Sequence, residues 1–271
     1  MAQIAYDNST TASGSGTSTT FSHTCTGSNG LLVVAVNMDG DKVTGITYNG
    51  VAMTFINKRT RTTSNYVYLY YLLGPATGSN SVVISHSSGN SLAVAMSYTN
   101  VKQSAQPDSS NTNSNGGGAA LTTATTVVAD NSWVIGCASN DSEVPASFSV
   151  QQRGAISIFQ AGDSNGGVAA GSSQLTATST PNSVGGQQMC VASFAPHPDD
   201  SFTAAKLTLT AAMIAPLIAI GTSYVATKLS MIGSMIAPVI TLNPWTNQTK
   251  NSATLSNQSK NATSFTNQQK S

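Results

Sequence analysis

The sequence predicts an all-β protein: an antiparallel β-sandwich, jelly-roll-like, followed by a repetitive apolar segment and an extended C-terminal repeat tail. Three observations predict this. Short runs rich in Val, Thr, Tyr and Ile recur between Gly, Ser and Asn turns through residues 1–198. No amphipathic helical pattern stands out among them. Two tandem repeats follow. We therefore predict a β-sandwich domain over 1–198, an apolar segment over 199–244 and a tail over 245–271.

The predicted strands follow one another at the spacing typical of sandwiches. They are 18–23, 31–37, 43–48, 51–56, 66–73, 81–86, 91–98, 121–129, 132–138, 156–159, 167–177 and 187–195. Asn49-Gly50 is the strongest hairpin signal, because a two-residue type I′ turn needs positive φ at both positions. The stretch NTNSNGGG at 111–118 is interpreted as a loop, and PHPDD at 196–200 as the domain boundary.

The composition favours an extracellular or virion setting. Charged residues make up 8% of the chain, against roughly 25% in an average soluble domain. A surface built of Ser, Thr, Asn, Gln and Gly suits a protein that packs against copies of itself. The lysines after residue 200 stand far apart and form no compact basic patch, so we expect no nucleic-acid partner. The N-terminus shows neither the basic nor the apolar region of a secretion signal.

The sequence offers no recognisable metal or cofactor site. Cys25, Cys137 and Cys190 form no CxxC or Cys/His cluster, and we interpret them as buried free thiols rather than a disulfide. Asp39-Gly40-Asp41 suggests a calcium loop but lacks the further oxygen ligands that such a loop supplies. We therefore expect no metal and no cofactor.

The sequence matches none of the common arrangements of catalytic residues, because the residue types that they require are scarce. His23, His86 and His197 are the three histidines, each in a different local setting, and no GxSxG motif accompanies them. His23 and His86 close predicted strands, where a hydrogen-bonded structural histidine is the simpler interpretation. The acidic residues fall in turns, as Asx-turn chemistry alone predicts. We expect a protein that is not an enzyme and has no catalytic residues.

Tyr66, Tyr68 and Tyr70 are the candidate binding residues of the predicted sandwich. Their spacing of two places all three rings on one face of one strand. Such a face is an interface, a glycan-stacking platform, or ordinary sheet packing, and the sequence leaves these alternatives open. The basic stretch at Lys58, Arg59 and Arg61 is a solvated loop or a contact with an acidic neighbour or glycan.

The apolar segment repeats itself. Residues 206–220 align with 228–242 at an offset of 22, sharing a Lys-Leu start and a MIAP core. A repeat of this kind favours stacked, β-rich packing between copies. A membrane-inserted hairpin and a buried helix pair are the alternatives.

The tail is a decapeptide repeat. Trp245, Leu255 and Phe265 open its copies, and Asn-Gln-x-Lys recurs within them. In an extended chain an even spacing places these three anchors on one side, whereas a helix would turn successive anchors apart by about 80°. We predict an extended docking strand with Trp245, Leu255 and Phe265 as its anchors; a disordered tail is the alternative.

The stretch from Ile4 to about Pro196 resembles a β-sandwich module of uncharacterised proteins of tailed phages and bacterial cell surfaces. The residues that carry the resemblance are AYDNST (5–10), TFSHTCTGSNGLLVVAVN (20–37), VTGITYNGVAMT (43–54), YLLGPATGSNSVVIS (71–85) and DNSWVIG (130–136). The resemblance implies a surface-display domain on fibres and appendages, with no catalytic residues attached to it.

Together these features predict a non-enzymatic structural protein of a phage virion (a fibre, decoration or tail component) or of an extracellular filament. It would self-assemble through its C-terminal third, with copies of itself and other virion or filament proteins as partners. The alternative is a bacterial cell-surface adhesin that binds a host-surface glycan or receptor and is anchored in the membrane through 206–242.

Overall fold

The computed structural model describes residues 3–61, 65–116, 119–141, 147–178 and 186–198. These residues form an all-β fold without a helix, and the strands pair antiparallel throughout the described part. The predicted all-β, antiparallel class is therefore confirmed. The described residues all belong to the first of the two units into which the chain divides, Met1–Ser201. The predicted apolar segment and the tail, with Trp245, Leu255 and Phe265, lie outside the described residues.

The strands build three sheets within the described residues. Their bounds are β1 Ala5–Cys25, β2 Leu31–Met38, β3 Val43–Tyr48, β4 Val51–Ala52, β5 Thr54–Thr60, β6 Tyr66–Leu73, β7 Gly78–Thr99, β8 Ser109–Asn115, β9 Leu121–Val127, β10 Trp133–Asn140, β11 Ser147–Phe148, β12 Gln151–Ile156, β13 Phe159–Asp163, β14 Gly171–Thr178 and β15 Gln187–Phe194. The first sheet has the order β4-β3-β7-β2-β6-β5, with β1 paired to β7; the second is β12-β13-β10-β15-β8, and the third β11-β14-β9.

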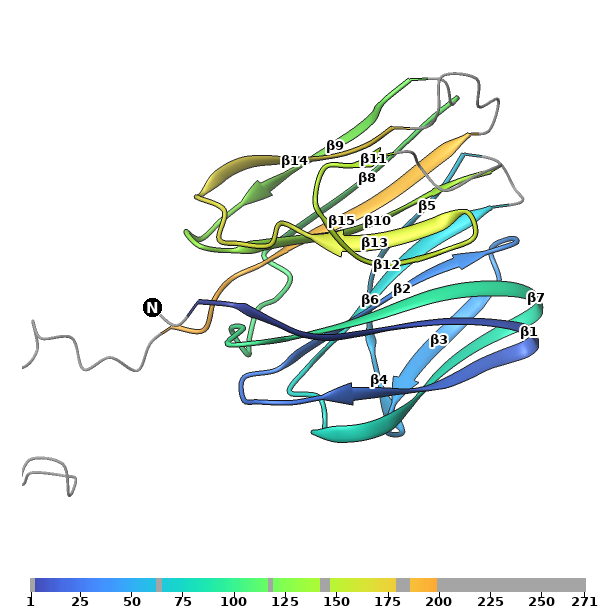
Figure 1. The fold of residues 1–271 in the computed structure, drawn as a ribbon, viewed down its shortest axis with the longest axis horizontal. Coiled ribbons are helices and arrows are strands. Elements are labelled where there is room, and N and C mark those ends of the chain that lie inside the picture. Colours follow the sequence, from blue (N-terminus) through green and yellow to red (C-terminus); the bar gives the residue numbers. More distant parts are fainter. Residues whose placement is uncertain (1–2, 62–64, 117–118, 142–146, 179–185, 199–271) are drawn as a thin grey trace, which may run out of the picture. The chain divides into compact units, whose positions relative to one another are not determined.

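The long pair β1 and β7 folds the first sheet onto itself. Both strands curve at one end and return in the adjacent layer (Figure 1), so β7 pairs with β3 in its first half and with β2 in its second. At the bend of β1, a Cβ on Gly14 would lie 2.2 Å from Thr19 Oγ1. Gly16 has a φ of 99° at the register shift. Glycine therefore permits both the close approach and the left-handed backbone.

The folded first sheet is nearly closed and barrel-like, with β4 and β5 at the two ends of its strand order and β1 paired to β7 alone. Its interior is a hydrophobic core that contains Val34, Met38, Tyr48, Tyr68 and Ile84. The chain passes directly from β4 into β5, because Met53 is the single residue between these two strands. The barrel therefore has a seam along residues 51–55.

Two further cores stack on the first within the described residues. The outer face of β2, β6 and β7 packs against β10, β13 and β15 through residues such as Val33, Leu69, Met96, Ile135 and Phe194. The opposite face of β10 and β15 packs against β9 and β14. Side chains alternate between faces along a strand, so β2, β10 and β15, which have a core on each face, are buried at every position.

Most predicted strands match the structure closely, and β3 and β6 have the predicted bounds. Asn49 and Gly50 have φ values of 49° and 77°, which confirms the predicted hairpin. The runs at 81–86 and 91–98 are one continuous strand, β7. The interpretation of 111–118 as a loop was wrong at its start, since Asn111–Asn115 belong to β8.

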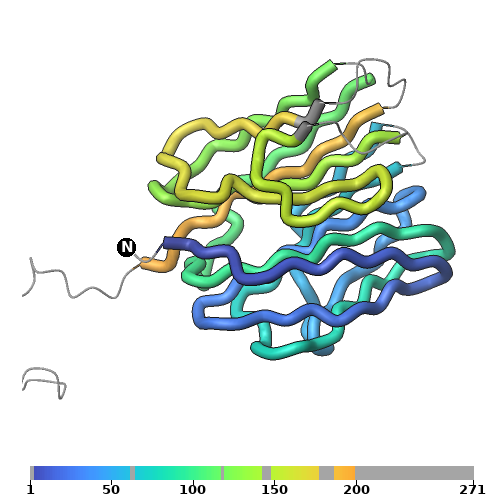
Figure 2. The backbone as a smooth tube through the Cα atoms, in the orientation of Figure 1, coloured from blue at the N-terminus to red at the C-terminus, as the bar shows by residue number. Residues whose placement is uncertain are grey.

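The two ends of the described unit lie side by side (Figure 2). Asn100 Nδ2 donates to the Gln3 carbonyl at 3.1 Å, and the His197 amide donates to the Asn100 carbonyl at 2.7 Å. The loop after β7 thus holds both ends of the unit, and the chain leaves it at Pro198 beside residue 3.

Candidate interaction surface

The three predicted tyrosines share one face of β6, and that face is the one turned into the barrel. Tyr68 and Tyr70 are 1% and 7% exposed, and both belong to the barrel core. The Tyr68 hydroxyl donates to Asp41 Oδ1 at 2.8 Å, and burial together with that carboxylate raises the pKa of Tyr68. Tyr66 is half-buried and stacks on Tyr68, with ring centroids 6.1 Å apart. Ordinary sheet packing therefore explains the position of Tyr68. Of the three tyrosines, Tyr70 alone lines a hollow at the surface of the barrel.

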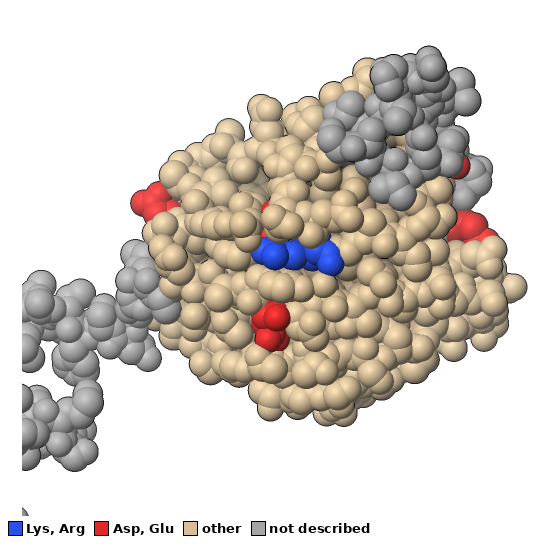
Figure 3. Space-filling model, in the orientation of Figure 1, with Lys and Arg blue, Asp and Glu red and all other residues tan. Residues whose placement is uncertain are grey.

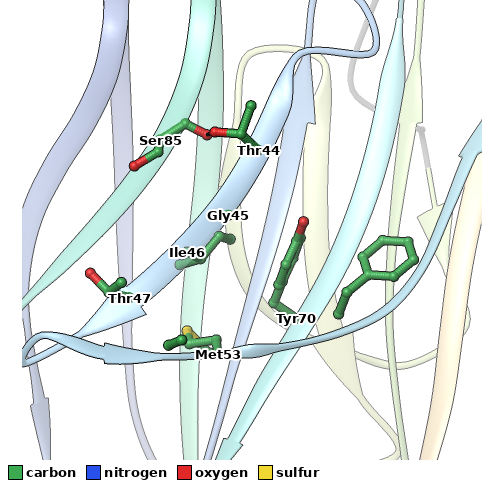
Figure 4. A pocket seen from close by; sticks show the side chains of 9 residues that line it. Thr44, Gly45, Ile46, Thr47, Met53, Tyr70 and Ser85 are labelled. Carbon is green, nitrogen blue, oxygen red and sulfur yellow. Dashed lines mark hydrogen bonds between the residues drawn. The ribbon is translucent and has the colours of Figure 1, made fainter.

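A shallow hollow of about 510 Å³ lies along the seam of the barrel. Figure 4 shows it between β3 and β5, with Tyr70 of β6 standing between these strands. We call it the seam hollow; its lining residues are Thr44, Gly45, Ile46, Thr47, Ala52, Met53, Phe55, Tyr70 and Ser85. The hollow exists because β4 has only two residues and covers β3 at Thr47 and Tyr48, leaving the start of β3 uncovered on that side.

The seam hollow has an apolar floor and a hydroxyl-bearing rim. Ile46, Met53 and Tyr70 are buried beneath it. Phe55 remains 47% exposed and meets the Tyr70 ring edge-on at 5.2 Å, and Val51 beside the hollow is 54% exposed. None of the described residues that line it is charged. Burial and the charge of Asp41 raise the pKa of Tyr70, so its hydroxyl stays neutral.

Charge is sparse on the described surface. Figure 3 shows a face on which few acidic and basic side chains appear. Lys42 pairs with Asp39 at 3.0 Å and Lys58 with Asp41 at 2.5 Å. The two carboxylates that suggested a calcium loop are thus neutralised by lysines. In the described part of the chain, no three His, Cys, Asp or Glu side chains group as metal ligands would.

The basic stretch after β4 also finds partners inside the chain. The Lys58 ammonium lies 6.0 Å from the centre of the Tyr66 ring, besides its pairing with Asp41. Arg59 Nε donates to Ser114 Oγ at 3.1 Å, which links β5 to β8. The interpretation of this stretch as a loop was wrong for Lys58 and Arg59, which belong to β5 and contact Asp41 and Ser114 of the same chain.

The histidines lie in separate hydrogen-bonding environments. His23 is buried with its Nδ1 2.9 Å from Thr10 Oγ1. His86 Nε2 lies 3.1 Å from Thr19 Oγ1, and its Nδ1 lies 2.9 Å from the Ser87 carbonyl. His197 follows β15 at the end of the unit, where its backbone amide is bonded. His23 and His86 are thus held by hydroxyls, but neither ends a strand as predicted, since β1 continues to Cys25 and β7 to Thr99, and the buried His23 Nε2 has no hydrogen-bond partner among the described residues.

Sequence reasoning identified Tyr70 but not Phe55 or Val51. The signal was present in VAMTF, where alternation after the Asn49-Gly50 turn would point Val51, Met53 and Phe55 to one side. What could not be predicted is that the strand breaks at Met53, which buries Met53 while Val51 and Phe55 stay exposed.

Comparisons of the chain with protein-family models, with curated proteins and with solved structures found no match. Among the described residues, the structure has no apolar helix of membrane-spanning length.

Proposed function

We propose that this protein is a non-enzymatic structural component of a phage virion, such as a fibre, decoration or tail protein, or of an extracellular filament. In this proposal the β unit is the displayed body, and residues 199–271 join copies of the chain or attach them to other virion or filament proteins. As part of the same proposal, the β unit has a jelly-roll-like topology and is related to the surface-display modules of phages.

The observation that carries the proposal is the exposed apolar seam on a surface poor in charge. Phe55 and Val51 stand at the edge of an uncharged hollow. Proteins that must remain apart usually carry abundant surface charge, and an exposed apolar patch often marks a contact with another protein. Stacked cores and fully buried central strands also suit a rigid building block.

Glycan binding is the second candidate, and the composition of the seam hollow favours it specifically. An exposed aromatic ring, Phe55, lines the same hollow as the hydroxyl-bearing side chains of Thr44, Thr47 and Ser85. Aromatic faces and hydroxyls are suited to neutral sugar rings, and no charged side chain among the lining residues would favour an acidic sugar. This candidate corresponds to the adhesin alternative, with a host-surface glycan as ligand.

The test is the oligomeric state of the full chain in the absence of detergent. We expect sedimentation velocity to show homo-oligomers or filaments, because the segment 206–242 is too apolar to remain exposed on a monomer. A single species of 27.7 kDa would contradict self-assembly. A neutral-glycan array, read with wild type and a Phe55→Ser variant, tests the adhesin alternative; monomeric protein that binds one glycan through Phe55 would support it.

A further inference from the structure

Cys137 and Cys190 are direct neighbours across the centre of the second sheet. The register of β10 and β15 runs without a shift from Trp133↔Phe194 to Asn140↔Gln187, and it places Cys137 opposite Cys190. Directly opposed residues of antiparallel strands have Cα atoms about 4.5–5.5 Å apart and side chains on the same face. That separation lies inside the range of about 4.4–6.8 Å found for disulfides.

Both thiols point to the same place in the core between the first and second sheets. Cys137 Sγ lies 4.0 Å from the Tyr68 carbonyl, and Cys190 Sγ lies 3.6 Å from the Val67 carbonyl. These carbonyls are consecutive on β6, so the two sulfur atoms converge on one site. Both cysteines are fully buried, and burial together with the neighbouring Cys137 thiol raises the pKa of Cys190.

Cys25 provides an internal control. It lies at the end of β1 in the barrel core, a different hydrophobic cluster from the one that holds Cys137 and Cys190. Its Cα partner in the register is Gly78 of β7, not a cysteine. Of the three cysteines, Cys137 and Cys190 are therefore the two that the fold places opposite each other.

We infer that Cys137 and Cys190 are a disulfide-forming pair that joins β10 to β15 when the chain folds under oxidising conditions. The oxidant is a low-molecular-weight disulfide such as oxidised glutathione. One protein thiolate attacks it and releases one glutathione thiol; the second protein thiolate then displaces the other glutathione. Two protein thiols and one glutathione disulfide become one protein disulfide and two glutathione thiols.

Burial decides when this exchange takes place. The thiolate is the attacking species, and the core disfavours it. Exchange therefore requires the cores to be open, during folding or during unfolding, and the folded, reduced protein should resist oxidation. Once formed, the bond closes a long loop that contains β11 to β14, and restricting the unfolded chain in this way stabilises the fold.

The experiment refolds full-length protein from denaturant with glutathione at an oxidising ratio, or with reductant, and then digests each sample with trypsin without reduction. Trypsin separates the cysteines, since Lys102, Arg153 and Lys206 bracket Cys137 and Cys190 in different peptides. We expect the peptides 103–153 and 154–206 to be joined after oxidative refolding, with Cys25 free. Folded, reduced protein given the same glutathione buffer should stay largely unlinked over the same period.

Thermal unfolding tests the stabilisation with matched variants. In a Cys25→Ser background, the oxidised sample should melt roughly 5–10 °C above the reduced one. The Cys25→Ser/Cys137→Ser variant should show no such difference. Oxidatively refolded wild type in which Cys137 and Cys190 are both still open to alkylation, or linked to Cys25 as often as to each other, would overturn the inference. A disulfide that forms but lowers the melting temperature would equally contradict it.

Discussion

At the scale of single residues, one buried ion pair holds two sheets together. Arg153 of β12 contacts Asp163 of β13 through two nitrogens, at 2.7 and 3.0 Å. Tyr98 of β7 donates to the same carboxylate at 2.9 Å, and the Arg153 guanidinium lies 3.9 Å from the centre of the Tyr6 ring. The pair thus links the second sheet to β1 and β7 of the first. Asp163 is fully buried, so these contacts replace the hydration that its carboxylate loses.

Replacing Asp163 by Asn should therefore be costly. We expect a loss of roughly 3–5 kcal/mol in the free energy of unfolding, because Arg153 would be left without its buried counter-charge. The matched control is Asp39→Asn, which breaks the exposed pair with Lys42 and should cost less than about 1 kcal/mol. Urea unfolding of the three proteins measures both. Equal losses for the two variants would show that the buried pair carries no special weight.

His23 should make the fold sensitive to mild acid. Burial lowers its pKa to about 4, although the negative charge of Asp7 acts in the opposite direction. Because the folded pKa lies below the usual value of 6.5, the unfolded chain takes up the proton first as the pH falls. Stability should therefore drop between about pH 6.5 and 4, by up to roughly 3 kcal/mol. Chemical unfolding across this pH range measures the slope.

A His23→Gln variant should flatten that slope. The carboxylate nearby titrates in a different range: burial raises the pKa of Asp7, but hydrogen bonds from Thr26 and Ser97 outweigh this and hold it below 3.8. Asp7 therefore contributes stability that is lost only as the pH falls further. An unchanged slope in His23→Gln would assign the acid sensitivity to another group.

At the scale of elements, β8 shows how a strand forms without hydrophobic residues. The side-chain amides of Asn111 and Asn113 donate to the Ala124 and Thr122 carbonyls of β9, at 2.6 and 2.7 Å. Each Asn oxygen also accepts the backbone amide of the next residue at 2.8 Å. The backbone of β8 pairs with β15 on its other side. Asparagines at alternate positions thus connect the edge of the second sheet to the edge of the third.

The Asn113→Ala variant should lose the hydrogen bond from the Asn113 side chain to the Thr122 carbonyl of β9. We expect a loss of about 1 kcal/mol, the usual net value of a hydrogen bond. Ser110 is an exposed position of the same strand, and Ser110→Ala should change stability by less than about 0.5 kcal/mol. Urea unfolding measures both. If the two variants prove equally stable, the asparagine hydrogen bonds to β9 contribute little to stability, and β8 is held by its pairing with β15 alone.

The seam of the barrel leads to a prediction about association. Changing Val51 and Phe55 together to Ser removes the two exposed apolar side chains beside the seam hollow. If the seam is a contact between copies, the double variant should associate at least tenfold more weakly, since each buried side chain contributes roughly 1.5–3 kcal/mol.

The matched control for the seam is Val128→Ser, because Val128 is 63% exposed and lies after β9, away from the seam. Sedimentation equilibrium of the full chain compares the variants. Association at wild-type strength in the seam variant, together with a normal circular dichroism spectrum, would exclude the seam as the contact.

At the scale of the whole molecule, Met1–Ser201 should fold on its own. It forms one compact unit with three stacked cores in its described residues. Expressed without residues 202–271, it should give a β-type circular dichroism spectrum and a cooperative melt, and it should associate less than the full chain. A mainly helical spectrum, or aggregation as strong as that of the full chain, would contradict this division of roles.

The C-terminal anchors can be tested by a triple change of Trp245, Leu255 and Phe265 to Ser. If the tail docks as an extended strand, the triple variant should fail to assemble, and a single change should only weaken assembly. Incorporation into the oligomer or filament is the measurement, with proteolysis of the tail as a second readout. Assembly at the wild-type level, with the tail cleaved equally in both proteins, would make the repeat a spacer.

The sequence by itself determined the class of the fold and most of its strands. β-branched and aromatic runs between Gly and Asn turns located β2, β3, β6, β10 and β15, because local propensity and turn chemistry act over a few residues. Burial of the three cysteines was also predictable, since they lie in or beside apolar runs. The even spacing of Tyr66, Tyr68 and Tyr70 correctly placed them on one face.

Only the tertiary structure decided which faces of these strands are buried and which strands lie beside them. A continuous apolar run such as LLVVAVN is compatible with several environments, and it became a strand buried on both faces because β1 and β7 fold back and further sheets stack behind it. Tertiary packing likewise enclosed Tyr68, exposed Phe55, joined Tyr98 to Asp163 and set Cys137 opposite Cys190. These contacts join residues distant in sequence, and their energy depends on the assembled layers. Local pattern therefore specified the strands, and long-range packing specified the site.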